Sequence, residues 1–293
     1  MPSFANFLHT QFILRIPLPS ASFASKTVIV TGANGSWHHR SVGGRSRIAL
    51  LDLESPSSIK SFVDRASTLS RLDVLINNAG IQSAASKTVF DTERTLAVNC
   101  IGTYLLALQL IPKLKETAHN NKDTPHMTFV GSALYDVANY PEEHGDDLFL
   151  WFKDESHVNR MNQYNLSKLL QLYAAIKLSK IVDPADTTHP NPVVINSLDP
   201  CFCKTGLPGG LTGSLKIVFK IFEWLTARTA EEGSRLVVQA ASAGRETHGL
   251  YMRAGAVQEY APIAQNDKRA TYVWELICKK LEKLQPGILQ NLH

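Results

Sequence analysis

Tyr164 and Lys168 are the two side chains from which a chemical function can first be inferred. They lie four residues apart in YNLSK, within a stretch of helical periodicity, so the phenol and the ammonium are expected on one helix face. A free phenol has a pKa near ~10 and exchanges protons poorly at neutral pH, whereas a neighbouring cation favours the phenolate. Pairs with this spacing are also common on ordinary helix surfaces. The pair therefore indicates proton transfer only if other residues support it.

Three further positions carry polar groups that suit such chemistry. Ser132 follows the apolar run FVG, and its hydroxyl can donate a hydrogen bond to a reacting carbonyl oxygen. Asn99 lies in the apolar stretch LAVNCIGTYLL, where a satisfied core amide or a helix kink is the alternative explanation. Asn78 belongs to NNAG at 77–80, which ends an apolar run at the edge where open α/β sheets bind ligands. Together these positions favour the functional interpretation of the Tyr–Lys pair.

The elements that must position these residues alternate between apolar runs and helical patterns. The apolar runs predict strands at residues 27–31, 47–53, 72–77, 127–130, 192–198 and 249–253. Helical periodicity predicts helices at residues 56–70, 91–117, 161–181, 215–226, 230–242 and 273–283. Such alternation is typical of a parallel sheet covered by helices on both faces. The predicted fold class is α/β, a Rossmann-type doubly wound parallel sheet, in one domain at residues 26–293.

The order of these motifs resembles that of the short-chain dehydrogenase/reductase family. The resemblance runs from about Thr27 to the C-terminus and extends to fungal reductases related to retinol dehydrogenases, many of which serve secondary-metabolite pathways. The segment RTAEEGSRLVVQAASAG at 228–244 and the ending KLEKLQPGIL carry this closer likeness. The resemblance implies a catalytic set made of Asn99, Ser132, Tyr164 and Lys168.

The resemblance also implies a role for each of these side chains while a nicotinamide cofactor carries the hydride. Tyr164 would exchange a proton with the substrate oxygen, and Ser132 would hold that oxygen. Lys168 would lower the pKa of Tyr164 and bind the ribose hydroxyls of the cofactor. Asn99 would keep a water-linked proton path to Lys168.

The cofactor implied by the resemblance is NADP, with NAD not excluded. The implied cofactor-binding residues are Gly32, Asn34, Asp52, Asn78, Tyr164, Lys168 and Thr205. The choice between the two cofactors depends on a charge that follows the family's second strand, and this strand is missing from the pattern.

The phosphate-binding loop departs from the family pattern. It begins as TGAN at 31–34 but continues as GSWH at 35–38, so two later glycines are replaced or displaced. Those glycines let the backbone approach a pyrophosphate at a helix N-terminus. We therefore expect this chain to bind its cofactor weakly, or to be a catalytically impaired binding protein. A methyltransferase or other Rossmann-like enzyme would leave the Tyr–Lys pair unexplained.

The segment after this loop is also short, because only fifteen residues separate Thr31 from Arg47. Generic dinucleotide folds would use Asp52, twenty residues after Gly32, to bind the ribose. LDLESPSSIKSF instead resembles a later Leu-Asp-Leu segment of the family, whose Asp lies near the adenine. The chain then lacks a helix, a strand and a second helix, roughly ~30 residues. A real deletion and an incorrect gene model explain this equally well. We expect residues 47–53 to pair directly beside residues 27–31.

Composition and charge limit the partners. The net charge of +4 is spread without a basic run, so no nucleic-acid partner is expected. The four cysteines show no framework spacing, which indicates a reducing, cytoplasmic location. Cys201-x-Cys203 lacks companion ligands, so no metal is expected.

The remaining sequence features are the N-terminal arm and a predicted lid. Residues 1–25 form an arm whose apolar stretch is broken by polar residues and prolines, unlike a secretory signal. No run of 18 or more apolar residues occurs, so no spanning membrane segment is expected. Residues 207–226 are expected to cover the substrate as a lid, and their segment GSLKIVFKIFEWL indicates a small lipophilic ligand. The sequence leaves homo-oligomer formation open.

Overall fold

The computed structural model describes residues 9–33, 47–182, 193–204, 223 and 225–293. Its centre is a six-stranded sheet in the order β1-β2-β5-β6-β7-β8. The strands are β1 (Val28–Val30), β2 (Val74–Asn77), β5 (His126–Val130), β6 (Val194–Asp199), β7 (Tyr251–Arg253) and β8 (Ala256–Gln258). Neighbours from β1 to β7 run parallel, and β8 pairs with β7 in the antiparallel direction. The predicted α/β class with a mostly parallel sheet is confirmed.

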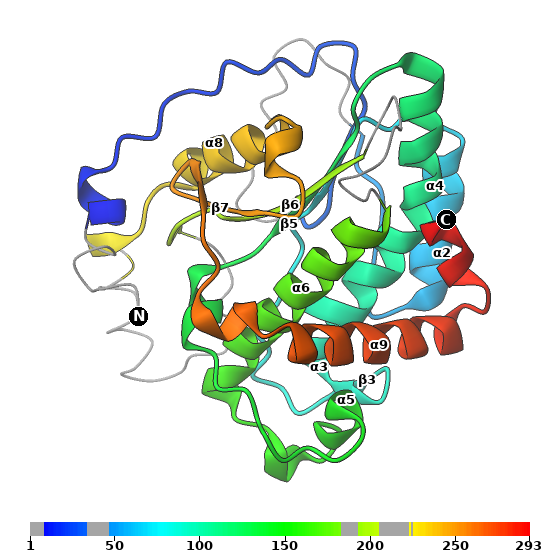
Figure 1. The fold of residues 1–293 in the computed structure, drawn as a ribbon, viewed down its shortest axis with the longest axis vertical. Coiled ribbons are helices and arrows are strands. Elements are labelled where there is room, and N and C mark those ends of the chain that lie inside the picture. The colour runs from blue at the N-terminus through cyan, green and yellow to red at the C-terminus, as the bar shows by residue number, and fades with distance from the viewer. Residues whose placement is uncertain (1–8, 34–46, 183–192, 205–222, 224) are drawn as a thin grey trace.

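Helices cover the two faces of this sheet (Figure 1). One layer holds α2 (Pro56–Ser67), α4 (Thr103–Asn121), α6 (Arg160–Val182) and α9 (Asp267–Leu284), and α8 (Ala230–Ala241) lies on the opposite face. Short elements complete the described part: α3 (Arg94–Leu96), α5 (Leu148–Trp151), the hairpin of β3 (Thr88–Val89) and β4 (Thr92–Glu93), the π-helical turns η1 (His9–Ile13) and η2 (Ala97–Gly102), and the 3-10 turns η3 (Ala133–Val137), η4 (Glu155–His157), η5 (Arg245–Thr247), η6 (Pro262–Gln265) and η7 (Ile288–Leu292).

Side-chain alternation along the strands builds two cores. On β2, Leu75 contributes to the larger core under α2, α4, α6 and α9, while Val74 and Ile76 face the smaller core under α8. Successive strand residues point to opposite faces, so an unbroken apolar strand supplies both layers. Ile16 of the N-terminal arm also packs into the smaller core.

Local signals set several helix starts. Pro56 occupies the first turn of α2, and the Ser55 hydroxyl accepts a hydrogen bond from the Ser58 amide. At α8, Thr229 and Glu232 form a reciprocal capping box. These caps satisfy amides that have no partner within the helix, which explains why these helices begin where the sequence predicts.

The predicted strand at 47–53 is wrong. These residues form no strand, and the side chains of Ile48 and Leu50 are 89% and 87% exposed. The segment is instead held against the helices: Leu53 is buried beside Gly102, and the Arg65 guanidinium donates to the Leu50 carbonyl at 3.0 Å. No described residue pairs with the outer edge of β1, so an edge was available, but residues 47–53 instead follow their contacts with α2 and Gly102. Direct pairing of 47–53 with β1 therefore does not occur.

The helix Arg94–Asn121, which joins α3, η2 and α4, is long and apolar enough to cross a membrane. Its apolar window is 94% buried inside the protein, as expected for a core helix. Most of the predicted helix at 215–226 and of the predicted lid lies outside the described residues.

Candidate active site

Tyr164 and Lys168 project from α6 toward the carboxyl end of β5. The Lys168 Nζ lies 5.7 Å from the centre of the Tyr164 ring, and the Tyr164 hydroxyl is hydrogen-bonded to Ser132. Ser132 directly follows β5 and Gly131, where it also caps η3 by accepting from the Leu134 amide at 3.2 Å. The structure thus brings together three of the four predicted catalytic side chains around one phenol.

Asn99 lies in the π-helical turn η2, which packs against α6. Its side chain is fully buried, its Oδ1 accepts from the Ile81 amide at 2.9 Å, and its Nδ2 donates to the Ile81 carbonyl at 2.9 Å. The second amide proton goes to the Ser167 hydroxyl, also at 2.9 Å. Asn99 therefore links the chain after NNAG to α6, and its side chain is a satisfied core amide as well as a candidate site residue.

Gly32 and Asn78 meet at the carboxyl ends of β1 and β2. The Thr31 hydroxyl accepts from the amides of Asn78 and Ala79 at 3.0 and 2.9 Å, and Asn78 Nδ2 donates to the Thr31 carbonyl at 2.8 Å. Gly32 has φ +69°, and a side chain there would meet the Ala79 Cα at 2.9 Å. Thr31 joins these two turns; it was not predicted as a site residue, although it opens the TGAN motif.

The other predicted cofactor residues are not part of this cluster. Asp52 is exposed, and its carboxylate accepts from the Glu54 amide at 2.9 Å just before α2. No hydrogen bond or ion pair joins Asp52 to Gly32, Asn78 or Lys168 in the described parts of the chain. Asn34 and Thr205 lie outside the described residues.

Burial dominates the electrostatics of the pair. It raises the pKa of Tyr164 to about 12; the negative charge of Asp199 also raises it, whereas the hydrogen bond to Ser132 lowers it. Burial lowers the pKa of Lys168 to about 8. The net pKa of Tyr164 is therefore raised in the protein alone, because desolvation of the phenolate is the largest cause. A lowering of this pKa by Lys168 stays a prediction.

Asp199 and Gln171 also lie at the site and were not predicted from the sequence. Asp199 ends β6, is 5% exposed, and lies 3.5 Å from the Arg253 guanidinium. Gln171 follows Lys168 by three residues on the same helix face, which was its one sequence signal. Gln171, Lys168, Ser132 and Tyr251 line a small cavity of about 10 Å³.

Cys201 and Cys203 are both buried, and burial raises the pKa of each thiol to about 12. Such a pKa disfavours the thiolate that binds zinc.

Known proteins resemble this chain at the level of the whole fold. A family model described as short chain dehydrogenase matches residues 26–122. Short chain dehydrogenase atnD of Emericella nidulans is 30% identical, over 90% of this chain and 95% of the relative. The chain belongs to the short-chain dehydrogenase/reductase family. It is therefore an oxidoreductase of a family that uses NAD(P).

Two further comparisons give one more relative and one structure with the same fold. Short chain dehydrogenase FGM9 of Gibberella zeae is 29% identical, over 96% of this chain and 92% of the relative. The structure of NADPH-bound carbonyl reductase from chicken fatty liver shares the fold with a TM-score of 0.50 at 20% identity, covering 73% of this chain and 77% of that one.

The pairwise alignment with a relative also contains positions that this chain lacks. The alignment with the Gibberella zeae relative spans 317 positions, whereas 96% of 293 residues is about 281 residues, so about 36 positions hold no residue of this chain. This shortfall agrees in size with the helix, strand and helix that the sequence pattern lacks.

The residues at the carboxyl edge of β2 and β5 fit the nicotinamide–ribose half of the cofactor. A lysine ammonium has three N–H donors, and two of those of Lys168 meet protein acceptors, which leaves one for a ribose hydroxyl. Gly80 lies next to this group, and a Cβ there would meet the Asn99 Oδ1 at 3.3 Å.

Proposed function

We propose that this protein is an NADP(H)-dependent oxidoreductase, with NAD(H) as the alternative cofactor, that interconverts a ketone and an alcohol on a small lipophilic substrate. The observation that carries the proposal is the hydrogen bond between Ser132 and Tyr164 beside the Lys168 ammonium. Gly32, Asn78, Tyr164 and Lys168 would hold the cofactor, together with Asn34 and Thr205. When bound, the cofactor supplies the hydride.

The protein side chains supply and hold the proton. With its pKa raised to about 12, Tyr164 is a protonated phenol at neutral pH, the form that can donate to a developing alkoxide. The Ser132 hydroxyl is placed to hold the same oxygen by a second hydrogen bond. A protonated phenol beside this hydroxyl would serve the reduction of a carbonyl, and the corresponding phenolate would serve the oxidation of an alcohol.

Exposed apolar side chains beside this pair support a lipophilic substrate. Leu134 and Val137 on η3 are 47% and 49% exposed, and Met161, one turn before Tyr164 on α6, is 74% exposed. Because η3 packs against α6, these exposed side chains lie on two adjoining elements that also carry or follow the Ser132–Tyr164 pair. The family's fungal relatives support a role in secondary metabolism.

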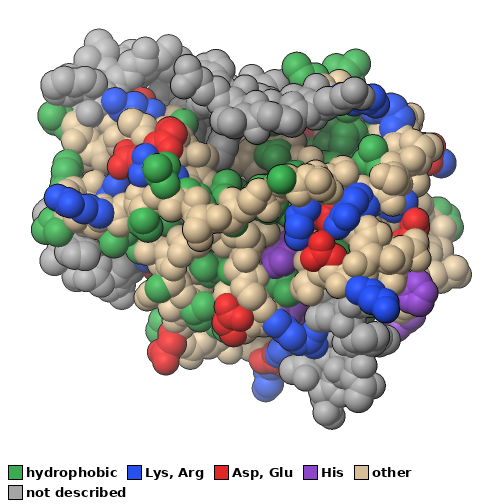
Figure 2. All heavy atoms as spheres, turned by 90° about the horizontal axis from the view of Figure 1, so that it is seen from above, with side chains coloured by type: hydrophobic (Ala, Val, Ile, Leu, Met, Phe, Trp, Pro, Cys, Tyr) green, Lys and Arg blue, Asp and Glu red, His purple; other side chains and the backbone are tan. Residues whose placement is uncertain are grey.

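The location that we propose is the cytoplasm. All four cysteines are free thiols, as expected in a reducing compartment. Figure 2 shows Lys and Arg side chains beside Asp and Glu side chains on one face of the molecule rather than a field of one sign, and this mixture supports a small-molecule partner rather than a nucleic acid.

The test is cofactor binding and turnover by the purified protein. NADPH and NADH are titrated by quenching of tryptophan fluorescence, and cofactor oxidation is followed with a panel of aliphatic and aromatic ketones. Saturable quenching with ketone-dependent oxidation supports the proposal. Saturable binding of a lipophilic ketone without cofactor binding would favour the binding-protein alternative.

A further inference from the structure

The side-chain amide of Gln171 bridges two groups at the heart of the site. Its Oε1 accepts a hydrogen bond from the Lys168 Nζ at 3.2 Å, and its Nε2 donates to the backbone carbonyl of Asn99 at 3.1 Å. Gln171 is 2% exposed, so both bonds form away from bulk water. The amide occupies the space between Lys168 and Asn99 in which a water-linked path was expected.

The turn that carries Asn99 and the helix that carries Gln171 are fixed to one another by further bonds. The π-helical turn Ala97–Gly102 departs from the regular α-helical ladder, and the Asn99 carbonyl receives the Gln171 amide. The Tyr104 hydroxyl, one turn later, donates to the backbone carbonyl of Gln171 at 2.7 Å. The glutamine is therefore held at both its backbone and its side chain.

The Lys168 ammonium has no carboxylate partner within the described part of the protein. The titratable groups that face it are Cys100 from η2, Tyr164 from its own helix, Tyr135 from η3 and Tyr251 from β7. Burial raises the pKa of all four, so each is uncharged at neutral pH. The charge of Lys168 depends on neutral acceptors.

Within the described residues, the Lys168 ammonium has two hydrogen-bond acceptors. The Val130 carbonyl at the end of β5 accepts from the Lys168 Nζ at 2.7 Å, and the Gln171 amide is the other. A buried charge is costly unless hydrogen bonds replace its hydration. Because the Val130 acceptor belongs to the backbone, Gln171 is the side chain through which sequence can tune this charge.

We propose that Gln171 is a positioning residue that holds the Lys168 ammonium in its charged form and fixes it to the turn of Asn99. Its consequence for turnover rests on the proposed function, because Lys168 acts there on the cofactor ribose. The hydrogen-bond role itself does not depend on which substrate the enzyme takes.

The direct test is the titration of Lys168 by NMR in protein labelled at lysine Cε, with Lys168→Met used to assign the resonance. Gln171→Met removes the acceptor with little change in side-chain volume, and Gln171→Glu replaces it by a carboxylate. Gln109→Met is the matched control, since Gln109 is also buried and donates to the Leu105 carbonyl of its own helix.

The proposal predicts opposite shifts. Gln171→Met lowers the Lys168 midpoint by about one pH unit, because the charged form loses an acceptor, and Gln171→Glu raises it by about one unit or more. Gln109→Met leaves it unchanged. Midpoints that stay at the wild-type value in both Gln171 variants would overturn the proposal, even if both variants lose stability.

A measurement on the wild-type protein covers the case in which the variants fail to fold. The Gln171 side-chain amide resonance is expected to shift with the same midpoint as Lys168, and a Gln171 resonance that ignores the Lys168 titration contradicts the bridge. The alkaline limb of kcat/KM for NADPH should move with the midpoint. Midpoints that move in a protein without turnover would refute the proposed function and leave this inference standing.

Discussion

Ser132 and Tyr164 share the hydrogen bond on which the proposed proton transfer depends. The bond stabilises the phenolate as well as orienting the phenol, since it lowers the pKa of Tyr164 against the effect of burial. Burial is the largest influence on the proton affinity of Tyr164 and raises its pKa; Asp199 raises it further, and the Ser132 hydroxyl lowers it.

The first prediction concerns the Ser132 hydroxyl. Ser132→Ala should lower kcat by roughly 10²-fold, because one preorganised donor to the reacting oxygen is lost. Steady-state NADPH oxidation at saturating ketone measures the effect. Ser179→Ala is the control for removal of a serine hydroxyl away from the site, as Ser179 is buried and donates within its own helix to Ile176. A Ser132→Ala enzyme that is as fast as the control would remove Ser132 from the mechanism.

The second prediction concerns the buried charge of Lys168. Its pKa is lowered from 10.5 to about 8 in the folded protein, so the folded state carries an unfavourable charge below pH 8. Between pH 8 and 10.5 the unfolded state binds more protons than the folded state, so stability rises with pH across this window. Lys168→Met should therefore be more stable than the wild type at pH 7, by about 1–3 kcal/mol, and this difference should shrink by pH 10. Urea unfolding at both pH values checks it; a constant difference contradicts the shift.

At this scale the sequence led to some residues and not to others. Ser132, Tyr164 and Lys168 stood out because polar groups interrupt apolar runs at recognisable spacing. Gln171 did not, because a glutamine in a helix is usually solvated and only the fold shows that its amide faces Lys168. Asp199 was hidden by its place at the end of a strand, where its burial depends on β7 and η3.

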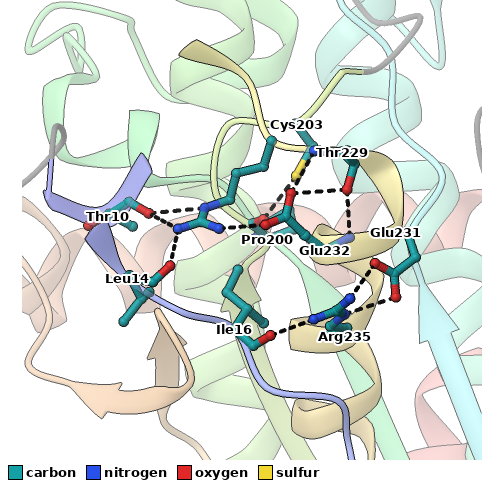
Figure 3. A network of polar contacts seen from close by, with 10 residues as sticks. Thr10, Leu14, Ile16, Pro200, Cys203, Thr229, Glu231, Glu232 and Arg235 are labelled. Atoms are coloured by element: carbon teal, nitrogen blue, oxygen red, sulfur yellow. Dashed lines mark hydrogen bonds and ion pairs between the residues drawn. The ribbon is translucent and has the colours of Figure 1, made fainter. Parts of the chain in front are cut away.

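At the scale of elements, Arg228 connects three segments that are distant in sequence. Its guanidinium donates to the Thr10 carbonyl at 3.0 and 2.7 Å and to the Leu14 carbonyl, and it forms an ion pair with Glu232 at 2.8 Å. Figure 3 shows these carbonyls of the N-terminal arm turned toward the start of α8, with Arg235 reaching Ile16 nearby. The arm is thereby fixed over the smaller core.

The third prediction tests this attachment. Arg228→Ala should lower the free energy of unfolding by about 2 kcal/mol, because charge-assisted hydrogen bonds to buried carbonyls are lost. Arg235→Ala should cost less, since Arg235 is more exposed than Arg228. Urea denaturation gives both values, and limited proteolysis should cut the arm of the Arg228 variant first. Equal, small losses in both variants would show that the arm is held by Ile16 packing alone.

Strand predictions succeeded where burial on both faces produced a continuous apolar run. Residues 72–77, 127–130 and 192–198 correspond to β2, β5 and β6 for this reason. Residues 47–53 have the same kind of run, but a run of apolar residues does not show whether the chain lies alongside a sheet edge; here contacts with α2 and Gly102 hold the segment. The edge strand β8 was missed because its three residues are exposed and carry no apolar periodicity.

At the scale of the whole molecule, the described sheet ends at β1 with an edge that no described residue covers. In the segment before α2, Ile48 and Leu50 are exposed. An uncovered edge and exposed apolar side chains are features that folded proteins normally avoid. The pairwise alignment with the Gibberella zeae relative has enough positions without a residue of this chain to hold a strand and two helices.

The fourth prediction follows from this shortfall. A version with the missing segment restored from a relative should bind NADPH roughly two to four orders of magnitude more tightly, because at least two charge-assisted hydrogen bonds to the phosphates are regained at ~1.5–3 kcal/mol each. Isothermal titration of the two proteins side by side provides the comparison. Equal micromolar affinities would mean that the short segment is a working phosphate site.

In the proposed reaction, Tyr164 donates the proton while a nicotinamide cofactor supplies the hydride. The most direct measurement is single-turnover reduction of a ketone by NADPH, compared between the wild type and Tyr164→Phe. We expect that the variant keeps its fold and its NADPH affinity but loses roughly 10²–10⁴-fold in the rate of the chemical step. A Tyr164→Phe protein that reduces the ketone at the wild-type rate would contradict it.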